Sequence, residues 1–299
     1  MRHPPLPGIV RVAPTSLKIA TSLPSKIAGS TPGLVSSAAL PSGNFFTLTA
    51  YADEASQPAA AGTTIELDAS GIRSVGGFGK PWVDLETGET ASRAEWFMAK
   101  SGINAAIVGN NVESISYSVE RGSGDAYLEA LFADDPTNMP THSTSFVFPC
   151  EDVAIRDDAS SSLSEANVIL SICAKMSYPA ESLSLVDAMT AGNLTFDEEF
   201  SLGHQYNTYM DVAAAQAIAD CTLTLTATFT DGSTQTKTYD IGLVPDYEQR
   251  IADYWNAAEE SGRDYELALH NGEEPSAEAI AKAENRPEEP ALYTLTEIA

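Results

Sequence analysis

Neighbouring carboxylates are the residues of this sequence whose type and spacing come closest to a known chemistry. A pair of acidic side chains can cleave a glycosidic bond when one protonates the leaving oxygen and the other acts as base or nucleophile. Suitable clusters are Asp134 with Asp135, Asp157 with Asp158, and Asp197 with Glu198 and Glu199. Because the chain holds 42 acidic residues, such clusters also arise freely in solvated turns, and we favour this structural interpretation.

Histidines and aromatic residues are the other side chains that could serve a site. His142, His204 and His270 lie in segments of different character, so we assign none of them as a base or a metal ligand. Some aromatic residues could form a platform on which sugar rings stack, although packing in the core or at its rim is the commoner role. They are Trp82, Trp96, Trp255, Tyr127, Tyr206 and Tyr209.

The motifs of well-known catalytic sites are missing from the sequence. It contains no HExxH, GxSxG, SxxK, CxxC or DxDxDG pattern. A phosphate-binding loop is excluded at Gly79 and Lys80, because Pro81 follows them and Ser74 occupies the position of the motif's first glycine. We therefore assign no catalytic, cofactor-binding or metal-ligating residue, and we favour a protein that is not an enzyme and needs no cofactor.

Three cysteines, Cys150, Cys173 and Cys221, have neither the density of a disulfide framework nor the spacing of metal ligands. A bridge between Cys150 and Cys173 could form in an oxidising compartment. We expect isolated buried thiols instead, since Cys173 and Cys221 sit within apolar strand patterns.

The charge of the chain is strongly negative and unevenly distributed. There are 16 Lys and Arg against 42 Asp and Glu, a net charge of −26, and every acidic residue lies after position 52. Such a surface repels phosphate backbones, which excludes nucleic acid as a partner. Two interpretations remain: a surface that keeps the protein soluble, or one that binds cations loosely.

The clearest structural element is a β-hairpin over residues 221–243, where apolar and polar residues alternate on both sides of Asp231-Gly232. A two-residue turn would place Tyr239 on the threonine face. A three-residue loop of Thr230, Asp231 and Gly232 keeps the apolar sets together, because a shift of one residue exchanges the faces. We therefore predict that Leu223 lies opposite Tyr239 and Cys221 opposite Ile241, with Gln235 and Lys237 making a polar tip.

Short alternating runs between turn signals predict further strands, and two alanine-rich or amphipathic runs predict helices. We expect residues 94–108 and 112–120 to form a second antiparallel pair, residues 76–82 an irregular connection and residues 121–145 mostly turns. The remaining expected strands are 44–51, 64–67, 145–148, 168–176, 194–200 and 292–298, and the helices are 211–220 and 246–262, followed by loosely helical residues up to 290. This pattern is typical of a mainly β protein, an antiparallel β-sandwich of Ig-like or related stacked sheets with a few peripheral helices.

The composition divides the chain into three regions. Residues 1–43 are basic and rich in Pro, Ser, Gly and Ala, which indicates a disordered linker; residues 44–245 make the sandwich body; residues 246–299 make a helical extension whose last strand could rejoin the sheet. No run in the linker is long enough for a signal peptide or a membrane span. We expect a membrane anchor upstream of Met1, so that the body is extracytoplasmic and meets the membrane only through that anchor.

Several phrases of the sequence carry a resemblance to known proteins: PSGNFFTLTAYADE, SGINAAIVGNNVESISYSVERG, CTLTLTATFTDGSTQTKTYDIGLVP and the closing LYTLTEIA. Over most of residues 44–299 the chain resembles uncharacterised proteins of anaerobic gut bacteria, in which a cytoplasmic tail and one transmembrane helix precede an extracytoplasmic β-rich region. That family has no assigned activity. The sandwich pattern, the acidic body and the lack of a clustered nucleophile, base or metal ligand favour a binding, sensing or structural module of the cell envelope, with an unknown envelope or extracellular ligand. A secreted glycan hydrolase with loop carboxylates, or the sensory half of an anti-sigma regulator, are the alternatives.

Overall fold

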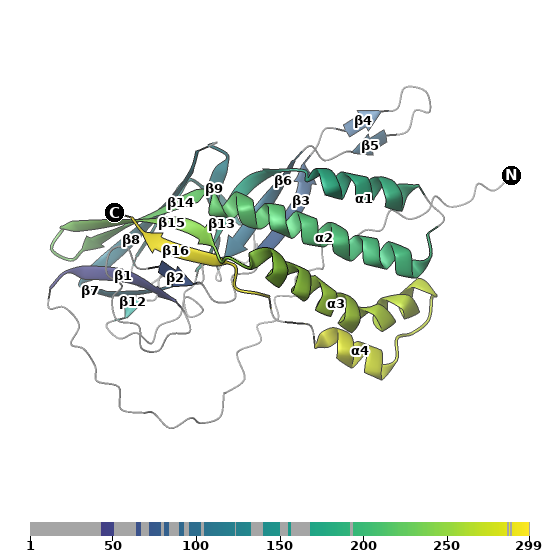
Figure 1. Ribbon diagram of the computed structural model, residues 1–299. Coiled ribbons are helices and arrows are strands. Elements are labelled where there is room, and N and C mark those ends of the chain that lie inside the picture. The colour runs from purple at the N-terminus through teal and green to yellow at the C-terminus, as the bar shows by residue number, and fades with distance from the viewer. Residues whose placement is uncertain are drawn as a thin grey trace. The chain divides into compact units, whose positions relative to one another are not determined.

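The computed structural model describes most of the chain after residue 42, and its architecture is mainly β (Figure 1). The expected linker of residues 1–43 lies outside the described part except for Gly43. The described residues are 43–50, 64–66, 72–78, 81–83, 90–92, 96–102, 105–122, 124–132, 140–149, 155–156, 168–191, 194–285, 287 and 289–298.

A six-stranded antiparallel sheet contains the predicted hairpin at its centre. In spatial order its strands are β11 (Ser145–Pro149), β8 (Val112–Arg121), β14 (Cys221–Phe229), β15 (Thr234–Leu243), β16 (Tyr293–Glu297) and β2 (Thr64–Glu66). The C-terminal strand thus lies between β15 and β2, as expected for a last strand that rejoins a sheet.

A five-stranded antiparallel sheet faces the first. Its order is β10 (Thr141–Ser143), β9 (Ala126–Phe132), β13 (Val168–Ser177), β6 (Trp96–Gly102) and β3 (Ile72–Phe78). Two smaller sheets complete the described strands: β1 (Phe45–Ala50), β7 (Ala105–Asn110) and β12 (Ile155–Arg156), of which β7 and β12 run parallel, and the pair β4 (Pro81–Val83) and β5 (Thr90–Ser92).

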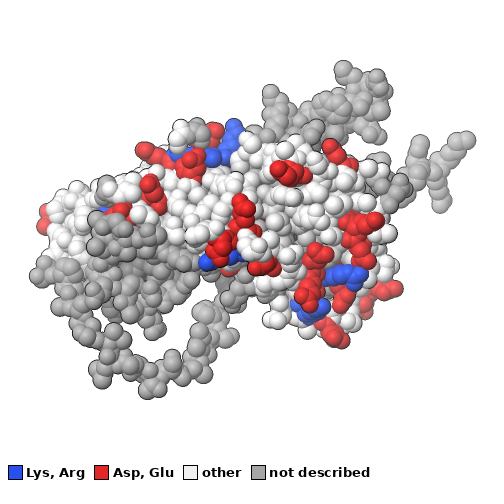
Figure 2. Space-filling model, viewed as in Figure 1, with Lys and Arg blue, Asp and Glu red and all other residues white. Residues whose placement is uncertain are grey.

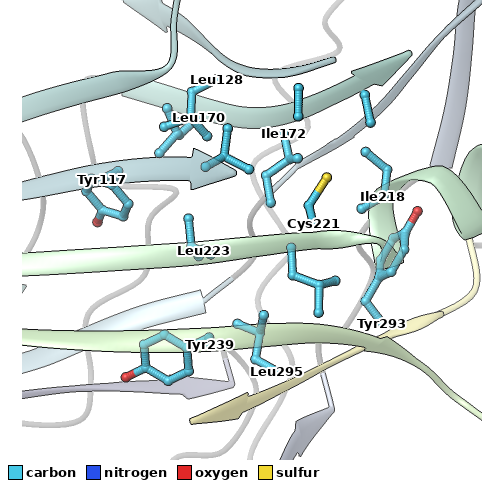
Figure 3. Packing of buried hydrophobic residues seen from close by; sticks show 14 of the residues in the cluster. Tyr117, Leu128, Leu170, Ile172, Ile218, Cys221, Leu223, Tyr239, Tyr293 and Leu295 are labelled. Atoms are coloured by element: carbon cyan, nitrogen blue, oxygen red, sulfur yellow. The ribbon is translucent and has the colours of Figure 1, made fainter. Parts of the chain in front are cut away.

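The two large sheets share one hydrophobic core. Figure 3 shows Leu128, Leu170 and Ile172 of the five-stranded sheet close to Leu223 and Cys221 of the six-stranded sheet. Leu223 has no exposed surface, whereas the threonines beside it on β14 are half-buried, as the alternation predicts. The predicted fold class, stacked antiparallel sheets with a few helices, is therefore confirmed.

The turn of the hairpin has the predicted three-residue loop. The amide of Phe229 donates to the carbonyl of Ser233 at 2.9 Å, and Gly232 has a φ of +81°, the left-handed conformation that glycine adopts without strain. The ladder places Leu223 opposite Tyr239, which confirms the predicted register. The prediction that Lys237 belongs to a polar tip is wrong, because this residue is buried and forms an ion pair with Glu297.

The described residues include four helices: α1 (Ala180–Thr190), α2 (Phe196–Ala219), α3 (Tyr247–His270) and α4 (Ala277–Glu284). Helix α2 ends directly before β14 and packs against β13, β6 and β3 of one large sheet and β15 and β14 of the other. Its buried face, with Met210, Ala214 and Ile218, belongs to the shared core.

Two helix boundaries differ from the prediction. The prediction of a strand over residues 194–200 is wrong. The Thr195 hydroxyl and the Glu198 carboxylate form a capping box there, which starts α2. Helix α3 does not stop at Gly262 but continues to His270, since one glycine weakens a helix interior without ending it. The chain leaves α3 at Asn271 and Gly272, the latter with a φ of +72°.

Several strand predictions are also wrong. The runs 94–108 and 112–120 do not pair: β7 pairs with β1, and β8 pairs with β14 and β11, because the chain passes between sheets at Asn111, whose φ is +59°. Residues 76–82 include the end of β3 and part of β4, and the segment 121–145 contains β9 and β10. Turn residues at the ends of these strands hid their short alternating patterns.

Candidate functional site

A groove of about 540 Å³ opens between the first turns of α1 and α3 and the C-terminal half of α2. This volume is within the usual range for sites that bind small ligands or single side chains of a partner. Helix α2 packs against both of the other helices, so all three walls belong to one packed unit. The lining residues are Pro179, Glu181, Thr208, Tyr209, Val212, Ala213, Gln216, Glu248 and Gln249.

The local sequence explains why these side chains meet. Helix α2 buries Met210, Ala214 and Ile218, which are spaced four residues apart. Tyr209 and Val212 lie on another side of the same helix and line the groove. The carboxylates come from the first turns of α1 and α3, where negative side chains interact favourably with the positive end of the helix dipole.

One wall of the groove is fixed by a short chain of hydrogen bonds. The amide nitrogen of Gln216 donates to the Tyr247 hydroxyl at 2.8 Å, and that hydroxyl donates to the Glu248 carboxylate at 2.9 Å. Partial burial raises the pKa of Tyr247, so the hydroxyl keeps its proton and remains a donor. The bonds position Glu248 while leaving its second oxygen able to accept another hydrogen bond.

The opposite wall carries side chains that have no partner within the described residues. Tyr209 is 41% exposed, the largest exposed aromatic side chain described, and Glu181 makes no hydrogen bond or ion pair there. Val212, Ala213 and Pro179 add apolar surface between these polar groups. The described lining therefore presents an aromatic ring, two carboxylates and an apolar floor, and it contains no Lys, Arg or His.

None of the acidic clusters considered for glycoside cleavage contributes a described residue to the groove. Asp134, Asp135, Asp157 and Asp158 lie outside the described residues. The third cluster is structural: Glu198 belongs to the capping box of α2, which lowers its pKa, and Asp197 forms an ion pair with Arg263 of α3.

The histidines are dispersed, and each has local partners. His204 donates from Nδ1 to the carbonyl of Phe200 at 2.9 Å and packs edge-on against the ring of Trp255. His270 packs against the ring of Phe196. His142 lies on β10 and contacts Glu129. No two of them approach a common centre in the described structure.

The six aromatic candidates do not form one platform either. Trp255 donates from its indole nitrogen to Asp211 at 2.8 Å, and Tyr206 accepts a hydrogen bond from Tyr178 at 3.0 Å, so both serve packing. Among the candidates whose side chains are described, Tyr209 alone lines the groove. The side chains of Trp82 and Trp96 lie outside what the structure describes.

A second polar cluster lies on β6, β9, β10 and β13. Glu129 forms an ion pair with Lys100 and a hydrogen bond with His142, and the ring of Tyr127 lies 4.9 Å from that of His142. Cys173 is buried beside them, and burial raises the pKa of its thiol to about 12. A protonated, buried thiol is a poor nucleophile, so this cluster lacks an activated group.

The cysteines that the structure describes are free thiols. Cys173 and Cys221 are both buried and unpaired, as expected from their strand patterns. Cys150 lies outside the described residues.

A buried ion pair links the C-terminal strand to the hairpin. The Lys237 ammonium lies 2.9 Å and 2.7 Å from the two carboxylate oxygens of Glu297, with both side chains largely shielded from solvent. The Tyr239 hydroxyl approaches the same carboxylate at 3.5 Å, and the ring of Phe46 lies 5.8 Å from the Lys237 nitrogen. This pair has a structural role in fixing β16.

The described part of the chain contains neither a group of metal ligands nor a membrane-spanning helix. No group of three or more His, Cys, Asp or Glu residues there could hold a metal ion. No helix there is long and apolar enough to cross a membrane.

Comparison with known proteins gives no relative: no family model, no curated protein and no solved structure matches this chain. The groove was not predicted from the sequence. Glu181, Tyr209 and Glu248 are far apart in the chain, and no short motif joins them. Only the packing of α1, α2 and α3 brings them to one place.

Proposed function

We propose that this protein is an extracytoplasmic binding module of a bacterial cell envelope, tethered to the membrane, that holds its ligand in the groove between α1, α2 and α3. The observation that carries the proposal is the groove itself, with the exposed Tyr209 ring and the unpartnered Glu181 carboxylate on its walls. The acidic body, which follows a basic N-terminal segment, supports the outward location.

Binding without catalysis is supported by how the reactive side chains are used. Nucleophilic catalysis needs a nucleophile within hydrogen-bond reach of an oriented base. Cys173 is protonated and buried, and His204 and Trp255 are engaged in helix packing. The groove holds binding groups: hydrogen-bond acceptors, one ring and apolar surface.

A glycan hydrolase is the second candidate, because Glu181 and Glu248 line the same groove beside an aromatic ring. Paired carboxylates with a sugar-stacking ring are the elements of such a site. If this were the function, the protein would release reducing sugars from soluble glycans, and Glu181→Gln and Glu248→Gln would each abolish the release.

The proposed function is tested by two measurements on the native protein. Protease treatment of intact cells should degrade residues 44–299, whereas a cytosolic control protein should survive. Equilibrium titration should then show ligand binding that Tyr209→Ala weakens. Leu269→Ala, which shortens an exposed apolar residue at the end of α3, should leave binding unchanged. Protection of the body in intact cells would contradict the location, and equal effects of the two substitutions would contradict the groove.

A further inference from the structure

We infer that the groove binds an arginine side chain presented by a basic peptide segment of a partner. This inference rests on the proposed function and names the ligand class of the same groove. It follows from the negative charge of the lining, from the aromatic ring that lies beside two carboxylates, and from the excess of acidic residues on the surrounding helices.

The lining favours a cationic hydrogen-bond donor. The two charged residues of the described lining, Glu181 and Glu248, are both acidic, and Glu248 retains an oxygen beyond the one that accepts from Tyr247. The side-chain nitrogens of Gln216 and Gln249 already donate to Tyr247 and Asp253. The groove's side chains thus present mainly oxygen acceptors, and a guanidinium group supplies five donors and no acceptor.

The aromatic and apolar parts of the lining suit the rest of an arginine. The guanidinium plane stacks on aromatic faces and pairs with carboxylates, which a lysine ammonium does less well. Tyr209 provides an exposed ring for this contact. Val212, Ala213 and Pro179 provide apolar surface for the aliphatic stem, which long charged side chains bury while their heads stay polar.

The charge around the groove extends the attraction beyond direct contact. The four helices hold 14 acidic residues and three Lys or Arg. Figure 2 shows carboxylates over the visible surface of this helical part. A surface of one sign raises the local concentration and the association rate of oppositely charged partners, and salt screens the effect.

The test is an equilibrium titration of the full chain with four probes at low and high salt: an arginine peptide, its citrulline analogue, propylguanidinium and a neutral oligosaccharide. The peptide Gly-Gly-Arg-Gly-Gly should bind at least tenfold more tightly than the same peptide with citrulline, which has the same shape without the charge. Free propylguanidinium should bind more weakly than the arginine peptide. Binding of the arginine peptide should weaken as salt rises.

Matched variants locate the interaction. Glu181→Gln, Glu248→Gln and Tyr209→Leu should each weaken binding of the arginine peptide about two- to fivefold. Glu260→Gln removes the same charge from α3 about 18 Å further along the helix. At about 0.1 M salt or above it should leave affinity unchanged, because that distance exceeds the screening length of about 10 Å.

Each other outcome overturns the inference in a recognisable way. Equal binding of the citrulline peptide would show that the groove binds peptides without recognising a positive charge, which would overturn the arginine site. Propylguanidinium binding as tightly as the peptide would identify a small organic cation as the ligand. Binding of neutral oligosaccharides with no binding of the arginine peptide would overturn the arginine site and preserve the proposed function. No binding by any probe would overturn both.

Discussion

The buried pair of Lys237 and Glu297 allows a sharp prediction about what holds the C-terminal strand in place. The two side chains are 11% and 8% exposed, and the ammonium contacts both carboxylate oxygens. Replacing one partner leaves the other charge buried without compensation, which typically costs about 3–5 kcal/mol. We expect Lys237→Met and Glu297→Leu each to lower the free energy of unfolding by that amount, or the melting temperature by roughly 6–20 °C at the sensitivity of a large domain.

The double variant distinguishes this explanation from a simple loss of packing. Two apolar residues of similar volume remove the desolvation cost of both charges, so the double variant should be as stable as the native protein or more stable by about 1–4 kcal/mol. Urea unfolding followed by circular dichroism measures all four proteins, and a double-mutant cycle gives the coupling. Single variants within about 1 kcal/mol of the native protein would show that solvent reaches the pair and would refute the reasoning.

Three further predictions concern other parts of the fold. Leu223→Ala should cost about 2–5 kcal/mol because the side chain is fully buried, and an unchanged melting temperature would contradict the face assignment. Thr195→Ala should cost about 1 kcal/mol through loss of the capping hydroxyl, while Thr195→Ser should restore it in the same unfolding assay. Cys173 should resist iodoacetamide at neutral pH, because burial raises its thiol pKa to about 12 from an ordinary 9.0. Since the unfolded thiol ionises first, its contribution to stability is complete below pH 9 and is lost as pH rises toward 12.

The sequence predicted the parts of the fold that local patterns determine. The hairpin loop followed from parity, because only a three-residue loop with Gly232 keeps Leu223 and Tyr239 on one face. Strands with long alternating runs, such as β13 and β8, were found for the same reason. Local patterns gave wrong predictions at two places. The alternating residues around Thr195 indicated a strand where a capping box starts α2, and Gly262 indicated a helix end inside α3.

The pairing of distant strands and the candidate site could not be predicted. Nothing near Val112 indicates that β8 pairs with β14 more than a hundred residues later, because that choice depends on the whole sheet. Lys237 appeared to belong to a polar tip, since its partner Glu297 is 60 residues away. The groove could not be predicted for the same reason, because Glu181, Tyr209 and Glu248 become neighbours only when three helices pack.

Hydrogen–deuterium exchange of the full chain tests whether the groove between α1, α2 and α3 is the binding site. The exchange is measured with and without a saturating probe, first Gly-Gly-Arg-Gly-Gly and then a neutral oligosaccharide. If the account is correct, at least one probe slows exchange in residues 179–184, 208–216 and 246–251, and leaves the hairpin of β14 and β15 unchanged. Protection confined to the sheets, or none with either probe, would contradict it.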